Sequence, residues 1–236
     1  MRKSAIIIVT IVAIFSMFIG YKYFKDDNVV VNENARQFKQ EYESLNNKVN
    51  EENGKKYPNV KVTNEKVIKY SSYEEIFEVL KTGTGVIYLG YPECPWCRNL
   101  VPIMLSAAAE AELETIYYLN IKEDRDLLML DSNGEIIVEK EGNKKYFQLV
   151  EVLSDILEEY ILTDIDGNTV DTGNKRIFVP LLVYVKDGKI LGHHLGTLED
   201  QEDPFIELTD RQQEELLMDL INNFSVISGV VCDDAC

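Results

Sequence analysis

Two cysteines three residues apart stand where a buried strand gives way to a helix, and this arrangement constrains the chain more than any other feature. Gly85–Gly90 is a short apolar run of the kind found in strands buried on both faces. Cys94-Pro-Trp-Cys97 follows, and apolar residues then recur with helical spacing as far as Ala111. A sulfur at a helix N-terminus lies near free N–H groups and the positive end of the helix dipole, which favour the thiolate. The pattern predicts an α/β fold in which Cys94 has a lowered pKa.

The pair has the chemistry of a redox centre, because a thiolate is the attacking species in thiol–disulfide exchange. Cys97 follows Cys94 by about one helical turn and can reach its sulfur, closing a disulfide and releasing a bound partner. Pro95 occupies the first helical turn, where its missing N–H is not needed, and Trp96 places a flat apolar surface beside the sulfurs. Two alternatives stay open, a static structural disulfide and a zinc site, and zinc would need a second cysteine pair.

Two sequence blocks resemble the thioredoxin family. Val86–Pro102 is similar to its active-site region, which has a strand, a loop, a Cys-x-x-Cys pair and a helix containing a proline. Val179–Gly196 is similar to the family's cis-proline strand, its hairpin and the following glycine. The resemblance implies that Pro180 is cis and lies against the cysteine pair, and that Val179 offers backbone groups to a substrate chain. The Cys-Pro-aromatic-Cys loop is nearer to glutaredoxins and to bacteriocin-transport accessory proteins than to ordinary thioredoxins.

The resemblance covers about residues 65–225 and implies a thioredoxin-like three-layer α/β/α sandwich. The sequence departs from the family pattern at Tyr88, where thioredoxins have a buried acid, and at Glu93, where they usually have tryptophan. The interval from Cys94 to Pro180 is roughly twice that of thioredoxins. We therefore expect an insertion at about 122–175 that contains a helix over 145–161.

An apolar segment near the N-terminus predicts a membrane anchor. Arg2 and Lys3 precede it, and the 21 residues from Ser4 to Phe24 carry one charge, Lys22, which can snorkel to the interface. The small residues of a signal-peptide cleavage site are missing, so we expect an uncleaved signal anchor and transmembrane helix over residues 1–25. The positive N-terminus should stay in the cytoplasm and leave the body extracytoplasmic. Cleavage would instead make the body a secreted protein.

The charge of the chain excludes one class of partner. The formal net charge is −17, and residues 28–236 alone carry 20 basic and 39 acidic side chains, a net charge of −19. Such a body would repel a phosphate backbone, so we expect no nucleic-acid partner. A hydrophobic fraction of 45% excludes wholesale disorder. An extracytoplasmic compartment permits disulfides.

Apolar spacing and turn residues predict the remaining elements and the domain boundaries. We expect strands at about 60–70, 115–121, 136–138, 177–185 and 189–195, and helices at 38–49, 72–81 and from 209 onward. The amphipathic helices are expected to pack in the core, with a partner groove as the alternative. The chain then divides into an anchor (1–25), a stalk with an amphipathic helix (26–60), a thioredoxin-like domain (61–225) and a C-terminal tail (226–236).

Cys232 and Cys236 in the tail flank two aspartates. The negative charge disfavours a thiolate, so this pair is a poor nucleophile and we predict a local structural disulfide. Exchange with Cys94 and Cys97 is the alternative. Free thiols or links to other chains would also fit.

Three further patterns could suggest functional sites. His193-His194 could suggest copper, but adjacent histidines in a strand point to opposite faces and are expected to have no ligand role. Asp164-x-Asp166-x-Asn168 faintly resembles a calcium loop but lacks its later ligands, so we expect a turn. Arg98 could support a thiolate, or it could be an exposed helix charge. We therefore predict no metal site and no dissociable cofactor.

Together these features predict a membrane-anchored extracytoplasmic thiol–disulfide oxidoreductase whose partners are protein thiols and disulfides. Cys94 and Cys97 would carry the reaction, with Trp96, Val179 and Pro180 contacting the substrate. A membrane redox partner would be compatible with the anchor. The competing hypotheses are a non-catalytic accessory or binding module, in which the pair is a structural disulfide, and a copper or zinc chaperone.

Overall fold

The computed structural model describes residues 33–51 and 53–230. Its centre is a five-stranded mixed sheet with the strand order β1-β3-β2-β8-β9. β1, β3 and β2 are parallel, whereas β8 is antiparallel to β2, and β9 to β8. The strands span Ile68–Tyr70 (β1), Gly85–Gly90 (β2), Ile116–Asn120 (β3), Leu181–Lys186 (β8) and Lys189–Leu195 (β9). The protein therefore has a mixed α/β fold.

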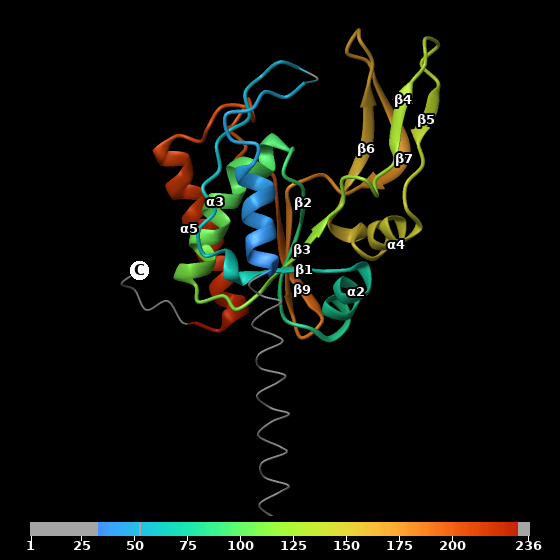
Figure 1. Cartoon of the computed structure of the whole chain (residues 1–236). Helices are drawn as coiled ribbons and strands as arrows, with labels where there is room; N and C mark the ends of the chain where they lie inside the picture. Colours follow the sequence, from blue (N-terminus) through green and yellow to red (C-terminus); the bar gives the residue numbers. More distant parts are fainter. Residues whose placement is uncertain (1–32, 52, 231–236) are drawn as a thin grey trace, which may run out of the picture.

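Helices cover both faces of this sheet (Figure 1). The helix over 33–43, α3 (Pro95–Glu110) and α5 (Asp210–Ser228) lie on one face, and α2 (Tyr73–Thr82) and α4 (Lys144–Val152) lie on the other. The central strand supplies both cores by simple alternation. Val86 and Tyr88 join the core under α3 and α5, while Ile87 and Leu89 join the core under α2.

Local signals predicted from the sequence are confirmed at the ends of several elements. Ser72 and Thr209 each form a capping box, which starts α2 and α5. Asp187 and Gly188 make the hairpin turn between β8 and β9, both with positive φ. Gly188 also donates its N–H to the Gly83 carbonyl oxygen at 2.8 Å, so the turn is held against the end of α2.

Two β-hairpins, which follow β3 and precede β8 in the sequence, extend beside the sheet (Figure 1). The first pairs β4 (Leu127–Leu130) with β5 (Ile136–Lys140), and the second pairs β6 (Glu158–Thr163) with β7 (Thr169–Arg176). We call these four strands the hairpin arm. α4 and a short 3-10 helix, Ser154–Ile156, separate its two hairpins. The Asp164–Gly167 segment is the turn between β6 and β7, as predicted.

The predicted helix over 145–161 is wrong in its second half. α4 ends at Val152, and the residues from Glu158 onward form a strand paired with β7. Leu153, Leu157 and Tyr160 are buried, as the helical repeat required, but they reach the interior from a helix end, a connecting segment and a strand. Apolar spacing over a short stretch does not distinguish these geometries.

The N-terminal elements also differ from the sequence prediction. The helix expected to run to residue 49 ends at residue 43, and it already includes residue 33, where the described residues begin. Val49 is 46% exposed in the segment that follows. Only Ile68–Tyr70 of the expected strand at 60–70 pairs with the sheet. Val60 and Val62 are buried without strand partners, because Asn46 Oδ1 and Glu43 Oε1 accept their backbone N–H groups at 2.8 and 2.9 Å.

The strand predicted at 177–185 begins only at Leu181. Residues 177–180 instead carry the connection from the arm to the sheet. No helix within the described residues is both long and apolar enough to cross a membrane. The predicted anchor, residues 1–25, lies outside the described residues.

Candidate functional site

The cysteine pair occupies the position at the start of α3 that the sequence predicted. Cys94 is the N-cap residue, and its Sγ accepts a hydrogen bond from the Cys97 backbone N–H at 3.4 Å. Pro95 stands in the first turn, where no N–H donor is lost. Both thiols are free, and the two residues approach to 3.3 Å without forming a disulfide. The helix N-terminus thus presents its donors to the first sulfur.

The two thiols differ in electrostatic environment. Burial raises the pKa of a thiol. At Cys94 this effect of burial is outweighed, and the pKa of the thiol is lowered. The groups that lower it are the Cys97 thiol, the backbone N–H groups of Cys97 and Trp96, and the positive charge of Arg125. Burial, followed by the hydrogen bond to Cys94 and the charge on Cys94, raises the pKa of Cys97 well above its ordinary value. Cys94 is therefore the readily ionised member of the pair.

The segment around Pro180 lies against this pair. The Val179–Pro180 peptide bond is cis, which confirms the expectation drawn from the resemblance. The Cys94 thiol donates to the Val179 carbonyl oxygen, with 3.7 Å between sulfur and oxygen. Half-buried Trp96 and Val179 pack against the same core cluster as the two cysteines. The structure thus brings together all the predicted site residues that it describes.

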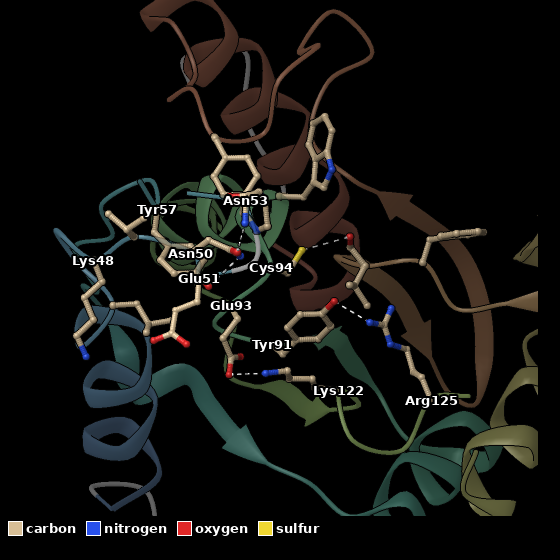
Figure 2. Close-up of a pocket in the computed structure, with 17 residues that line it drawn as sticks. Lys48, Asn50, Glu51, Asn53, Tyr57, Tyr91, Glu93, Cys94, Lys122 and Arg125 are labelled. Carbon is tan, nitrogen blue, oxygen red and sulfur yellow. Dashed lines mark hydrogen bonds and ion pairs between the residues drawn. The ribbon is translucent and has the colours of Figure 1, made fainter. Parts of the chain in front are cut away.

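A cleft of about 760 Å³ opens over Cys94 (Figure 2). Segments 45–51 and 53–57 contribute one wall, and Tyr91, Glu93, Lys122 and Arg125 line the cleft as well. Val179 and Phe205 complete the lining together with Trp96. Cys94 itself is only 5% exposed, so a partner must enter the cleft to reach its sulfur.

Arg125 is a site residue that the sequence prediction missed. Its guanidinium donates to the Tyr91 hydroxyl at 2.7 Å and lies 4.9 Å from the centre of the same ring. This contact holds a positive charge beside the cleft, where it acts on Cys94. The order of the strands could have indicated its position, because Arg125 follows β3 and the cysteine loop follows β2. Parallel neighbouring strands end at the same edge of a sheet.

Glu93 is paired with a positive charge within the cleft. Its carboxylate forms an ion pair with Lys122 Nζ at 2.8 Å. Lys122 also comes from the segment after β3. The negative charge next to Cys94 is thus matched by a positive charge from the neighbouring strand end.

Arg98 does not occupy the exposed position that one reading of the sequence gave it. The side chain is fully buried, and Nε donates to the Pro58 carbonyl oxygen at 2.7 Å. Its Nη1 donates to the carbonyl oxygens of Tyr42 and Pro92 at 2.8 and 3.2 Å. The guanidinium therefore binds the N-terminal segment to α3, and its burial follows from carbonyl groups that satisfy its donors.

The remaining candidate sites are separate from the cysteine pair or outside the structure. His194 Nδ1 lies 3.3 Å from Asp219 Oδ2, beside a second groove of about 990 Å³ that shares Trp96 and Val179 with the cleft. No group of three metal-ligating side chains is found among the described residues. Cys232 and Cys236 lie outside the described residues, so their pairing stays a prediction.

No family model matches this chain, and a search of curated proteins finds no match.

Proposed function

We propose that this chain is a thioredoxin-fold thiol–disulfide oxidoreductase. The observation that carries the proposal is the asymmetric cysteine pair at the start of α3. Cys94 has a lowered pKa and lines a cleft, whereas Cys97 is fully buried behind it. The cis peptide bond at Val179–Pro180 beside Cys94 supports the resemblance to thioredoxins, as does the sandwich of helices around a mixed sheet. The two-hairpin insertion is the main elaboration of that fold.

The proposed reaction needs only the two sulfurs and a partner disulfide or dithiol. The Cys94 thiolate attacks a partner disulfide, so that one S–S bond breaks and a mixed disulfide forms, and the departing partner thiolate takes up a proton. Cys97 then loses its proton and attacks Cys94, and the second partner thiolate leaves. Two electrons pass from the cysteine pair to the partner, and the reverse sequence oxidises a partner dithiol. Val179 would hold the partner backbone through its carbonyl group, beside Trp96.

We also propose that residues 1–25 anchor the protein in the membrane with its body extracytoplasmic. The support is the sequence pattern of that segment. The acidic body and the free cleft would then face an oxidising compartment, where partner proteins carry disulfides.

The test is to trap the mixed disulfide with the full-length protein in membranes. Cys97→Ala should accumulate disulfide-linked adducts that a reductant dissolves, because Cys94 can attack but the adduct cannot be resolved. Cys94→Ala is the matched control and should accumulate none. If Cys97→Ala traps no adduct and the full-length wild type does not exchange with glutathione, the proposal fails.

One observation favours the competing function, a binding module with a static pair. Cys94 is 5% exposed, less than a freely accessible nucleophile would be. A static structural disulfide would resist reduction by glutathione, whereas a redox centre would exchange with it at a measurable reduction potential. Titration of the pair against glutathione buffers therefore separates the two functions.

A further inference from the structure

We propose that Tyr88, held by Tyr42 of the N-terminal helix, is a catalytic residue that stabilises the Cys97 thiolate as it forms. The inference rests on the proposed thiol–disulfide exchange and concerns its second step. There Cys97 must ionise while fully buried, and a buried thiolate needs a hydrogen-bond donor in place of water.

Tyr88 is the side chain placed to supply that donor. It is fully buried in the middle of β2 and belongs to the same core cluster as the fully buried Cys97. Donors from the Tyr91 backbone and then from the Tyr88 hydroxyl act to lower the pKa of the Cys97 thiol. Gly90 leaves the space that the ring requires, since a Cβ at position 90 would lie 2.6 Å from the Tyr88 hydroxyl oxygen. A side chain at position 90 would therefore displace the Tyr88 hydroxyl.

Two further aromatic residues fix the Tyr88 ring. The Tyr42 hydroxyl lies 2.6 Å from the Tyr88 hydroxyl, and both groups are buried. On β3, Tyr118 stacks on the Tyr88 ring with 5.2 Å between centroids. When Tyr42 donates to the Tyr88 oxygen, the Tyr88 proton is free to point at the Cys97 sulfur. The N-terminal helix thus completes the surroundings of the buried cysteine.

Tyr88 acts as a donor and not as a base. Burial, followed by the nearby Cys97 and Tyr118, raises the pKa of Tyr88 well above its ordinary value, so the hydroxyl keeps its proton. In the second step the S–H bond of Cys97 breaks and the Cys94–Cys97 bond forms, while the bond from Cys94 to the partner sulfur breaks. The proton lost by Cys97 is balanced by the one that the departing partner thiolate takes up. Tyr88 lowers the cost of the intervening thiolate.

The test compares Tyr88→Phe with wild type in the full-length protein, using the decay of a mixed disulfide formed with glutathione. The expected result is about tenfold slower resolution near neutral pH, the equivalent of a hydrogen bond to a charged group, with the pH midpoint of that step moved upward. The rate of Cys94 alkylation should stay unchanged. Tyr42→Phe should move the same midpoint in the same direction by less.

Tyr184→Phe is the matched control. Tyr184 is also buried, and its hydroxyl has no hydrogen-bond partner within the described part of the chain. An unchanged resolution profile in both Tyr88→Phe and Tyr42→Phe, with wild-type exchange intact, would overturn this inference alone. Failure of the wild type to form or resolve a mixed disulfide would instead overturn the proposed function.

Discussion

Arg98 Nε lies 2.7 Å from the carbonyl oxygen of Pro58, inside the protein and away from solvent. The same guanidinium also donates to the Tyr42 and Pro92 carbonyl oxygens and to Asn46. One side chain on α3 therefore fixes the end of the N-terminal helix, the segment before the sheet and the loop that leads to Cys94.

Replacing Arg98 with alanine should destabilise the fold by about 3 kcal/mol or more, because three buried carbonyl groups would lose their donor. Urea unfolding of the full-length protein measures the effect. Arg211→Ala is the control, since that side chain is 63% exposed and its ion pairs with Asp200 and Glu215 lie on the surface. A loss below about 0.5 kcal/mol for Arg98→Ala would show that the buried network contributes little.

Removing the charge of Arg125 should raise the pKa of Cys94. Burial opposes ionisation of this thiol, and the Arg125 charge is one of the groups that outweigh burial. In Arg125→Gln the thiolate should form at higher pH, so alkylation of Cys94 near neutral pH should slow. The pH profile of alkylation measures this shift. Lys140→Gln, on the hairpin arm, removes an equal charge as control, and equal shifts in the two variants would contradict a local effect.

His194 should make the folded state less stable in mild acid. Burial lowers the pKa of His194, and the Asp219 carboxylate offsets only part of that shift. The unfolded chain therefore binds the proton more readily than the folded protein does. The free energy of unfolding has its full value above a pH of about 6.5, where His194 is neutral in both states, and it decreases as the pH falls below that value.

This titration should give a slope of up to about 1.4 kcal/mol per pH unit below that value, and His194→Asn should reduce it. Urea unfolding between neutral pH and about pH 5.5 tests this. His193→Asn is the control because it leaves the His194–Asp219 pair intact. If His194→Asn keeps the wild-type slope, other groups control the acid response.

Gly188→Ala should destabilise the protein by about 2 kcal/mol more than Gly167→Ala. Both glycines have positive φ in hairpin turns, so both substitutions strain the backbone by about 1 kcal/mol. A Cβ at Gly188 would also lie 2.2 Å from the Lys81 carbonyl oxygen, whereas one at Gly167 would meet no atom of the described residues within 4 Å. Thermal or urea unfolding measures the difference, and equal losses would mean that the turn can move away from α2.

The cysteine loop, both capping boxes and the β8–β9 hairpin were predictable because each depends on neighbours in sequence, whereas the cis proline was expected only from the resemblance to thioredoxins. Ser72 needs only Glu75, for example, and Cys94 needs only the helix that begins after it. The continuous apolar run of β2 likewise indicated a strand buried on both faces.

The residues that complete the site were not predictable in this way. Arg125 reaches the cleft through the parallel pairing of β2 with β3, and Tyr42 reaches Tyr88 across 46 positions of sequence. In the sequence, Arg98 cannot be distinguished from an exposed charge on a helix. Its burial depends on the irregular segment around Pro58, which packs over the side chain. Strand order and irregular backbone decide these contacts, and neither leaves a periodic signal in one sequence.

The hairpin arm departs from and returns to a single region of the core. Ile121, just after β3, and Ile177, just after β7, belong to the same buried cluster. About 55 residues, which include α4 and the hairpin arm, connect them. Closing the longer connection costs the central sheet only about 2 kcal/mol of chain entropy relative to a loop of about five residues. The length and surface of the arm can therefore change through evolution at little cost to the sheet that supports Cys94.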